Sequence, residues 1–507
     1  MRGPETNPFR KPIATSLGAF ALVTLAACGG GGGSSSATPP VSQPPPAPTT
    51  GTVAMLLTDA PTDQFCQILA TVERIDLLGA NGPTNVFTGP ETVDILGMRN
   101  FSDVFSIADG VPVGTYEKIR LTLSDLALVE CNDLGEPEPE SGWDRPKLPG
   151  NGKLDLNPRG SFQVVGGETL VIELDLDMTK SLHLVSAGNS GKWQFRPVVF
   201  VTIAPDDTKL VRVFGEVRTL DGMRFELCPV ASPSSMGDGE MNGTPDGKRC
   251  LDVATDAQTG VFGEDGLPSG LGGVVAGDPL TAIGFLESYY TGSGSSRTSR
   301  LRLNAVVVEL GPLDTFERIA GTVATAPGGN DIFEFTPDGA PAAIDVLLQS
   351  GTRIFSIGSN AELDAGFIQP GTVGEVDGVF ADPATDPVTE PLRAALIVLE
   401  EGASAPEVAL LDREIESTEE VAPPTDPVTG TITLKALDPP AAFDCVKTTA
   451  DTRLLRITET ATSSETAEIV FGDLEADDKV DVYGSVDPGD AACVIADTVQ
   501  AYAAPAP

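Results

Sequence analysis

The side chains that could do chemistry in this chain are mostly carboxylates. In the segment Thr169–Asp177, three of them (Glu173, Asp175 and Asp177) recur at every second position, which in a strand places them on one face. Neighbouring carboxylates on such a face lie roughly 6.5–7 Å apart and repel each other unless a cation or a basic side chain offsets their charge. Hard oxygen ligands of this kind suit calcium, whereas the simpler interpretation is a solvated polar face.

A second acidic grouping lies between Cys228 and Cys250. Its sequence, Asp238-Gly-Glu-Met-Asn-Gly-Thr-Pro-Asp246, is similar to the start of an EF-hand calcium loop. Arg249 stands at the twelfth position, where such a loop needs a bidentate glutamate, and no flanking helices are expected. The favoured interpretation is therefore a flexible acidic hairpin.

Acid–base and nucleophilic catalysis find little support. His183 is the only histidine, and the sequence Ser181-Leu-His-Leu-Val predicts a solvated position on a strand rather than a catalytic base. No nucleophile elbow, phosphate-binding loop or dinucleotide fingerprint occurs in a fitting context. Carboxylate pairs are too frequent in so acidic a chain to identify a glycosidase. We therefore expect a protein that is not an enzyme.

Three aromatic residues are candidates for stacking against a ligand. Trp143 lies in the polar segment Ser141-Gly-Trp-Asp-Arg145, where we expect it to be exposed and to bind ligand. Tyr289 and Tyr290 precede a Gly/Ser turn and predict an aromatic tip, which either binds sugar or packs against a neighbouring part of the chain. Trp193 is assigned to the core.

The overall charge excludes one large class of partner. The 507 residues contain 32 Lys and Arg against 73 Asp and Glu, a formal net charge of −41. Nucleic-acid binding needs clustered cations that neutralise phosphates, so no nucleic-acid partner is expected. The same charge resists self-association and favours a monomer.

The first 50 residues predict export and anchoring to a membrane. A basic start is followed by an apolar stretch, residues 13–27, that is too short to span a bilayer. The stretch ends in Leu25-Ala-Ala-Cys28, which is typical of a lipobox, where the cysteine is acylated and residues 1–27 are removed. Residues 28–50 then predict a Gly/Ser/Pro-rich tether, and Gly29 favours the outer membrane in a Gram-negative cell. An ordinary secretory signal that contains a cysteine is the alternative.

The other six cysteines indicate an oxidising compartment. An even number in an exported chain makes disulfides the expected state, and the absence of a C-x-x-C spacing argues against zinc. Six cysteines allow fifteen pairings. One pairing keeps every bridge inside one candidate module: Cys66–Cys131, Cys228–Cys250 and Cys445–Cys493.

Residues 51–205 predict a β-domain, because segments rich in Val, Ile, Leu and Thr are separated by Gly, Pro and Asn. Four separated motifs follow one another in it: Leu56-Leu-Thr-Asp-Ala-Pro61, Pro112-Val-Gly-Thr-Tyr116, Leu174-Asp-Leu-Asp177 and Phe195-Arg-Pro-Val198. In these motifs the region resembles the bacterial lipoprotein family called domain of unknown function 4382. The resemblance implies a secreted or lipid-anchored β-sandwich without a catalytic mechanism.

The resemblance also adds a residue to the acidic face. Asp59 lies in the Thr-Asp-Ala-Pro motif of that family, and Asp175 and Asp177 form its Asp-x-Asp motif. If Asp59 folds near the other two, the three carboxylates form a candidate calcium site. Otherwise Asp59 shapes a turn.

The rest of the chain predicts three small β-repeats. Similar openings recur at nearly equal intervals: Phe214-Gly-Glu-Val217, Ala320-Gly-Thr-Val323 and Thr429-Gly-Thr-Ile432. Each unit carries a second glycine inside a later strand, where a side chain would collide at a tight barrel corner. The units resemble domain of unknown function 5666, and each is expected to be a five-stranded barrel of the OB type. Their predicted bounds are 211–311, 317–402 and 428–507, with residues 403–427 as an acidic, Pro-rich linker.

The sequence therefore predicts an all-β, lipid-anchored protein of the cell envelope, with an N-terminal β-sandwich followed by three OB-like repeats. Its expected role is non-catalytic binding or surface interaction, with carbohydrate or an envelope protein as partner and calcium as candidate cofactor. A structural spacer without a small ligand is the alternative. A carboxylate-dependent polysaccharide hydrolase comes third.

Overall fold

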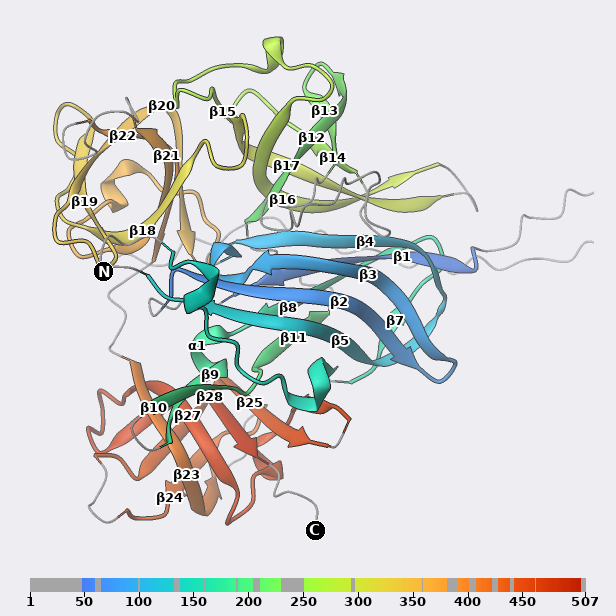
Figure 1. Cartoon of the computed structure of the whole chain (residues 1–507), viewed down its shortest axis with the longest axis vertical. Coiled ribbons are helices and arrows are strands. Elements are labelled where there is room, and N and C mark those ends of the chain that lie inside the picture. Colours follow the sequence, from blue (N-terminus) through green and yellow to red (C-terminus); the bar gives the residue numbers. More distant parts are fainter. Residues whose placement is uncertain are drawn as a thin grey trace, which may run out of the picture. The chain divides into compact units, whose positions relative to one another are not determined.

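The fold is seen in a computed structural model (Figure 1). It describes residues 48–59, 65–98, 101–131, 137–158, 160–187, 190–203, 210–228, 250–292, 297–357, 359–380, 390–400, 407–421, 427–437, 442–460 and 462–502, and only the backbone at 184–187, 190–192 and 407. The lipobox with Cys28, most of the tether and the acidic segment 238–246 lie outside these ranges. No helix within them is long and apolar enough to cross a membrane.

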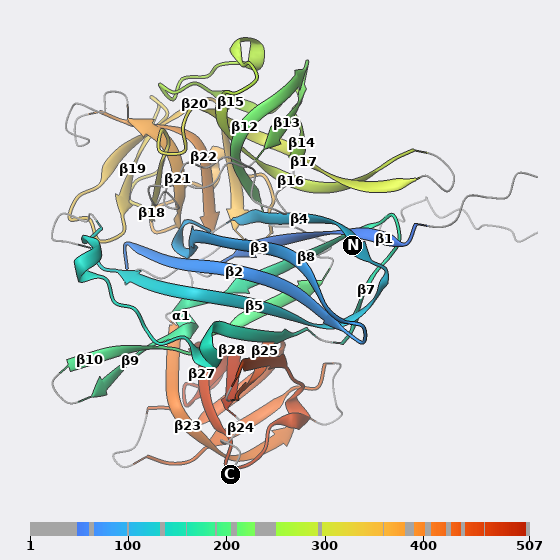
Figure 2. The ribbon, with the colours of Figure 1, turned by 45° about the vertical axis from the view of Figure 1, so that its right-hand side comes forward.

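The N-terminal domain is a sandwich of two sheets (Figure 2). One sheet has the order β11-β8-β1-β4, formed by β11 (Val199–Ile203), β8 (Thr169–Leu176), β1 (Thr50–Thr58) and β4 (Ser102–Pro112). The other has the order β3-β2-β5-β6, formed by β3 (Gly82–Asp94), β2 (Gln67–Gly79), β5 (Gly114–Val129) and β6 (Lys153–Asn157), with β7 (Phe162–Val164) also beside β5. The predicted sandwich is confirmed.

Alternation along the strands builds the core between the two sheets. In β8, Ile172 and Leu174 are fully buried in this core, as the pattern of the sequence predicts. The segment 193–203, expected as one strand, is instead two, because the chain leaves the hairpin of β9 (Leu182–Ala187) and β10 (Ser190–Phe195) at Pro197 before it enters β11. Its predicted apolar face is nevertheless kept, since Phe195, Val199 and Val201 all pack into the core.

Three five-stranded barrels follow, each with the strand order 1-2-3-5-4 closed back on strand 1, and with strands 3 and 5 parallel. This is the order of an OB-type barrel. Barrel 1 is β12 (Val211–Asp221), β13 (Arg224–Cys228), β14 (Leu251–Ala254), β16 (Pro279–Thr291) and β17 (Thr298–Leu310); barrel 2 is β18 (Glu317–Val323), β19 (Ile332–Pro337), β20 (Ile344–Ile357), β21 (Val373–Phe380) and β22 (Leu392–Glu400); barrel 3 is β23 (Glu407–Glu420), β24 (Gly430–Leu434), β25 (Cys445–Glu459), β27 (Lys479–Val486) and β28 (Cys493–Tyr502).

Short elements complete the described chain. Strand β15 (Gly260–Phe262) lies beside β17, and β26 (Ser464–Glu468) lies beside β25. The helices are α1 (Met178–Ser181) and the 3₁₀ turns η1 (Ile95–Met98), η2 (Glu140–Gly142), η3 (Pro149–Gly152), η5 (Leu271–Gly273), η7 (Ala365–Phe367) and η8 (Phe471–Asp473).

The third repeat begins earlier than the sequence predicts. Much of the expected linker is β23, the first strand of barrel 3, which pairs with both β24 and β27. The backbone amides of Val217, Val323 and Ile415 make the same hydrogen bond in the three barrels, each to the carbonyl of the residue directly before strand 4. These three residues are therefore equivalent positions in strand 1. In barrels 1 and 2 a glycine lies two residues before this position, but in barrel 3 the corresponding residue is Arg413 of β23. The glycine motif that predicted the start of the third repeat is therefore Gly430, which lies in strand 2 of that barrel.

The second repeated glycine fits a corner that recurs in all three barrels. A register shift falls directly before Gly284, Gly378 and Gly484 in strand 4. A Cβ atom on these glycines would lie 2.1, 2.5 and 2.0 Å from a backbone carbonyl oxygen of strand 5. The carbonyl of the facing alanine also accepts a hydrogen bond from a threonine hydroxyl, in the pairs Thr259–Ala305, Thr352–Ala394 and Thr452–Ala496. The predicted corner glycines are therefore confirmed.

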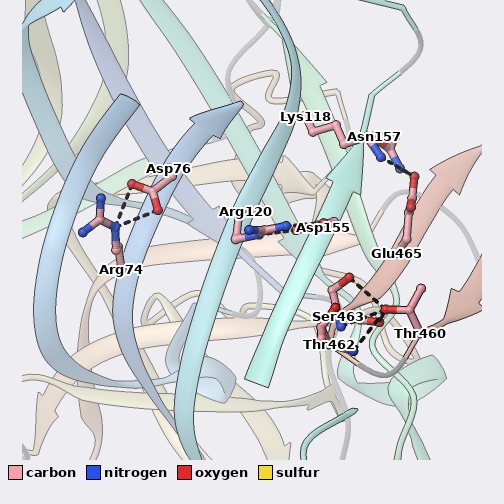
Figure 3. A network of polar contacts seen from close by, with 10 residues as sticks. All are labelled: Arg74, Asp76, Lys118, Arg120, Asp155, Asn157, Thr460, Thr462, Ser463 and Glu465. Carbon is pink, nitrogen blue, oxygen red and sulfur yellow. Dashed lines mark hydrogen bonds and ion pairs between the residues drawn. The ribbon is translucent and has the colours of Figure 1, made fainter. Parts of the chain in front are cut away.

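The sandwich is joined to the barrels by continuous sheet. Strand β4 pairs in parallel with the start of β12 in barrel 1, and β6 pairs in parallel with β26 beside barrel 3. Polar contacts follow the second junction (Figure 3), where Lys118 Nζ and Asn157 Nδ2 lie 2.6 and 2.8 Å from Glu465 Oε1. An apolar cluster that includes Phe101, Phe262 and Phe355 joins the sandwich, barrel 1 and barrel 2.

Substitution of the corner glycine should destabilise barrel 1. In Gly284→Ala the new Cβ would meet the Asn304 carbonyl oxygen, so either the bulge or strand 5 must shift, at a cost of about 1–3 kcal/mol. We expect a lower urea midpoint of unfolding. Gly272→Ala is the matched control, because a Cβ there meets nothing within 4 Å. Equal urea midpoints for the two variants would contradict the requirement for glycine at the barrel corner.

Candidate functional site

The predicted calcium ligands do lie near one another, but they have other partners. Asp59 is buried, and its Oδ1 accepts a hydrogen bond from the backbone N–H of Met178 at 3.0 Å. Asp177 caps the N-terminus of α1 by accepting from Lys180 N, and its Oδ2 lies 2.6 Å from Lys180 Nζ. Asp175 lies near the C-terminal end of β8, opposite Thr58 of β1.

This arrangement does not support a metal site. Across the part of the chain that the structure describes, no three Asp, Glu, His or Cys side chains form a group that could hold a metal ion. The solvated-face interpretation is also wrong for Glu173, which is buried and accepts a hydrogen bond from Ser102 Oγ at 2.8 Å. The acidic face of β8 is turned toward barrel 1 because β4 and β12 join there, which the sequence of β8 alone could not indicate.

Trp143 is not the exposed aromatic that the sequence predicts. Its indole packs against the small cluster of Leu69, Ala127 and Val129 on the outer face of the sandwich. Its Nε1 donates to the Glu138 carbonyl at 2.7 Å. The ring therefore holds the loop against the sheet of its own domain, because burial of aromatic surface lowers the free energy of the folded chain. Trp193 packs against the main core, as expected.

His183 is likewise not solvated. It is 9% exposed, and its Nε2 lies 3.9 Å from Oδ2 of the fully buried Asp481 of barrel 3. Burial lowers the pKa of the imidazole, and the charge of Asp481 opposes that effect. Tyr502 donates to the same Asp481 oxygen at 2.7 Å. This cluster is filled by protein side chains and joins the β9–β10 hairpin to barrel 3.

A groove opens between the sandwich and barrel 1, which we call the junction groove. It measures about 280 Å³ and continues into a second hollow that shares Glu226, Asp252, Tyr289 and Arg300 with it. Its walls come from both modules. The sandwich contributes Thr52, Asp109 and Thr169, and barrel 1 contributes residues of β13, β14, β16 and β17.

Strand register explains why charged side chains gather in the junction groove. Glu226 of β13 and Asp252 of β14 are directly opposite each other, and the parallel pairing of β14 with β17 places Arg302 beside Asp252. Asp252 Oδ2 lies 3.0 Å from Arg302 Nε. Two carboxylates that face each other across neighbouring strands repel. The guanidinium of Arg302 offsets part of this electrostatic repulsion.

Tyr289 supplies the aromatic surface of the groove. The guanidinium carbon of Arg302 lies 4.0 Å from its ring centroid. Burial, followed by a hydrogen bond to Asp252, raises the pKa of the phenol. Tyr290, in contrast, lies at the rim, where its hydroxyl donates to Glu168 Oε2 of the sandwich at 2.8 Å. Tyr289 therefore faces the groove, where it could meet a ligand, whereas Tyr290 packs against the neighbouring module.

All three disulfides follow the pairing that keeps each bridge within one module: Cys66–Cys131, Cys228–Cys250 and Cys445–Cys493. One of them bears on the groove. Cys228 ends β13 and Cys250 precedes β14, two residues from the facing pair Glu226 and Asp252, and Cys250 itself lines the groove. The bridge holds together the two strands whose carboxylates face the cavity.

Sequence reasoning identified Tyr289 but missed Glu226, Asp252 and Arg300. A partial signal exists in Arg224-Phe-Glu-Leu-Cys228, where Phe225 and Leu227 enter the core and the alternate residues must face outward. Which outward residues meet a cavity depends on the pairing of β13 with β14 across the segment between the two cysteines.

A second charged group is buried where the sandwich, barrel 1 and barrel 2 meet. Arg212 Nη2 lies 2.6 Å from Asp377 Oδ2 and 3.3 Å from Glu375 Oε1. Among the described residues, buried polar atoms of Arg212, Arg318, Glu309 and Asp377 have no hydrogen-bond partner. The charged groups that face one another are Asp103 (β4), Arg212 (β12), Glu309 (β17), Arg318 (β18), Glu375 and Asp377 (β21).

Carboxylates outnumber guanidinium groups in this junction. Burial, reinforced by the charge of Asp377, raises the pKa of Glu309 to about 8. Burial also raises the pKa of Asp377 to about 6, although Arg212 opposes the rise. The junction thus binds protons near neutral pH.

Taken together, the described chain is an all-β protein built of a sandwich and three OB-like barrels, with the junction groove between the sandwich and barrel 1. A family model described as "Domain of unknown function (DUF4382)" matches residues 50–197, which contain every strand of the sandwich except β11. The first predicted resemblance is therefore confirmed for that domain. No curated protein matches the chain. One solved structure, "drosophila Unr CSD456", aligns with 58% of this chain and 97% of its own at 13% identity, but its TM-score of 0.16 supports no argument about the fold.

Stability should fall as the pH rises through the range in which Glu309 titrates. Its pKa is higher in the folded than in the unfolded chain, so its contribution is complete below about pH 4.5 and is lost between about pH 4.5 and 8, at up to about 1.4 kcal/mol per pH unit. Glu309→Gln should remove this part of the slope in urea unfolding measured from pH 5 to 9. The exposed Glu317→Gln is the control. A parental slope in Glu309→Gln would refute the assignment.

Calcium should not stabilise the protein specifically. Because Asp177 is already paired with Lys180 and Asp59 with a backbone amide, we expect equal calcium and magnesium concentrations to change the melting temperature equally. Thermal unfolding of the full chain in each ion, and in chelator, checks this. A calcium-specific increase that Asp177→Asn abolishes would restore the calcium site.

Proposed function

We propose that the protein is a lipid-anchored, extracytoplasmic binding protein whose junction groove takes a neutral, polyhydroxylated ligand of the carbohydrate class. The observation that carries the proposal is the groove itself, in which Tyr289 lies among Asp109, Glu226, Asp252 and Arg300. An aromatic ring beside closely spaced hydrogen-bonding groups suits a sugar, which has an apolar face and a rim of hydroxyls.

The charges of the groove favour a neutral ligand. The row Glu226, Asp252 and Arg302 places two carboxylates and one guanidinium side by side across barrel 1. Such a row offers hydrogen-bond acceptors and donors, and its excess of carboxylates disfavours an anionic ligand. The net charge of −41 disfavours polyanions, nucleic acids included.

Binding rather than catalysis agrees with the partners of the carboxylates. Asp252 is paired with Arg302, and Asp109 Oδ1 accepts a hydrogen bond from Thr52 Oγ1 at 2.6 Å. Glycoside hydrolysis needs one carboxyl group that stays protonated as the acid beside a second that is ionised. Asp109 and Asp252 instead have hydrogen-bonding partners within the protein, an arrangement that suits a binding site.

The lipobox supports anchoring through acylated Cys28, in the outer membrane of a Gram-negative cell. The three disulfides support an oxidising compartment. A structural spacer is the second candidate, because the sheets of the sandwich continue into barrels 1 and 3 and would hold the modules in a fixed arrangement.

A binding experiment on the full chain tests the proposal. An array of neutral and acidic oligosaccharides should give at least one neutral ligand, whose affinity is then measured by calorimetry. Tyr289→Ala should weaken it about tenfold, because a stacked aromatic is worth about 0.5–1.5 kcal/mol beyond its buried area. Phe367→Ala, which removes a 51%-exposed aromatic from barrel 2, should bind normally. If no oligosaccharide binds, or if both variants bind equally, the spacer role replaces the binding role.

A further inference from the structure

Barrel 2 is attached to the rest of the protein in a different way from barrels 1 and 3. The sheets of the sandwich continue into barrel 1 through β4 and β12, and into the sheet of barrel 3 through β6 and β26. The five strands of barrel 2 instead close on one another, and none of them pairs with a described strand outside the barrel. Side-chain contacts and the connecting chain therefore hold barrel 2 in place.

Strand alternation gives barrel 2 an apolar surface against barrel 1. On β17 of barrel 1, Val308 enters the core of that barrel, whereas Val307 joins an apolar cluster shared with barrel 2. The ring centroids of Phe285 (barrel 1) and Phe355 (barrel 2) lie 5.8 Å apart. This mutual burial of apolar surface favours docking of the two barrels. We call the barrel 2 side of the cluster the docking face: Phe355, Val379, Ala395, Leu396 and Val398.

The same alternation encloses acidic residues between the docking face and barrel 1. Glu309 lies two residues after Val307 on β17, and Asp377 lies two residues before Val379 on β21. Both acidic residues are almost fully buried, at 2% and 1% exposed. Asp377 is paired with Arg212, whereas Glu309 Oε1 has no hydrogen-bond partner among the described residues. The docked state therefore buries a carboxyl oxygen that the described chain leaves without a partner.

The charged groups around Glu309 come from the sandwich, barrel 1 and barrel 2. The residues paired with Glu309 in the sheet, Thr281 of β16 and Phe262 of β15, carry no titratable group. Four carboxyl groups, that of Glu309 included, thus share two guanidinium groups. A buried excess of negative charge is costly, so the docked state favours a protonated Glu309. The other charged groups are Asp103 (β4), Arg212 (β12), Arg318 (β18), Glu375 and Asp377 (β21).

We propose that the proton on Glu309 controls the docking of barrel 2. While Glu309 is protonated, the apolar surfaces of the two barrels stay together. When Glu309 loses its proton, the buried negative charge favours a state in which barrel 2 has separated from barrel 1 and the sandwich as a folded unit. Barrel 2 is able to separate in this way because its strands close on one another, so that undocking breaks no sheet.

The pH dependence of undocking has a defined sign and range. Burial raises the pKa of Glu309 to about 8 in the docked state, whereas after undocking the carboxyl group meets water and titrates near its ordinary value of 4.5. The undocking equilibrium constant should therefore rise by up to about tenfold per pH unit between these values and level off above them. Asp377, whose pKa is raised to about 6, adds to the rise only at lower pH.

Thiol trapping in the full chain tests the proposal, because it detects rare openings. Val398→Cys places a thiol on the docking face, and Val346→Cys places one inside the same barrel, at positions that are 2% and 0% exposed. Each chain also carries Cys28→Ser, which removes the remaining cysteine outside the disulfides. The rate of reaction with iodoacetamide is divided by that of a free model thiol at the same pH.

The two thiols should differ in rate. At pH 8 we expect position 398 to react about a hundredfold faster than position 346, because undocking leaves barrel 2 folded and only its unfolding exposes position 346. The corrected rate at position 398 should rise about tenfold from pH 6.5 to 7.5 and stop rising above about pH 8.

Glu309→Gln identifies the controlling group, because its amide keeps the shape of the carboxyl group and carries no charge. Combined with Val398→Cys, it should hold the corrected rate at the low level expected below about pH 4.5 and remove the pH dependence. Glu317→Gln is the matched control. Because Glu317 is exposed at the start of β18, its substitution should leave both the rate and its pH dependence unchanged.

Two results would overturn the proposal. Equal corrected rates at positions 398 and 346 would mean that the docking face opens only when barrel 2 unfolds. A rate at position 398 that does not change with pH, or a pH dependence that survives in Glu309→Gln, would mean that Glu309 does not control docking. Val307→Cys, on the facing surface of barrel 1, gives the same readout if Val398→Cys does not fold.

Discussion

The hydrogen-bonding demand of the sheet edges is the constraint on which the rest of this structure depends. A sandwich leaves unpaired N–H and C=O groups along its outer strands, which invite association with other chains. Here β4 pairs with β12 of barrel 1, and β6 pairs with β26 beside barrel 3. The free edge strand β3 contains Pro83 and Pro90, and proline cannot extend a ladder. The barrels therefore complete the sandwich as well as following it.

This way of joining modules decides where polar side chains become buried. Strand β8 meets barrel 1, so Glu173 is enclosed and takes Ser102 as its partner. Arg212, at the start of β12, is enclosed among carboxylates of barrel 2. The junction groove exists for the same reason, since Thr52 and Asp109 of the sandwich meet Asp252 and Tyr289 of barrel 1 only when the sheet continues between them. The groove therefore depends on the way in which the sandwich and barrel 1 are joined.

The distribution of charge then separates the surfaces by task. The net charge of −41 disfavours polyanionic partners on electrostatic grounds. The groove is lined by the carboxylates of Asp109, Glu226 and Asp252 together with the guanidinium of Arg300, and we propose that it takes a neutral polar ligand. A chain with net charge −41 can hold a surface of mixed charge because strand alternation assigns each outward position separately.

Features that depend on short-range pattern could be predicted from the amino-acid sequence. Alternation revealed the β class and the buried face of β8, the positions of Gly284, Gly378 and Gly484 marked the barrel corners, and module boundaries led to the disulfide pairing. That β23 is a strand and not a linker became visible only in the folded chain, because Arg413 stands where the other two barrels have the glycine of their first strand. The tertiary structure also turned Trp143 inward, gave Asp177 to Lys180, and brought Glu226 and Asp252 to a groove. The reason is physical: alternation says which side chains face outward, but only long-range pairing says what an outward side chain meets.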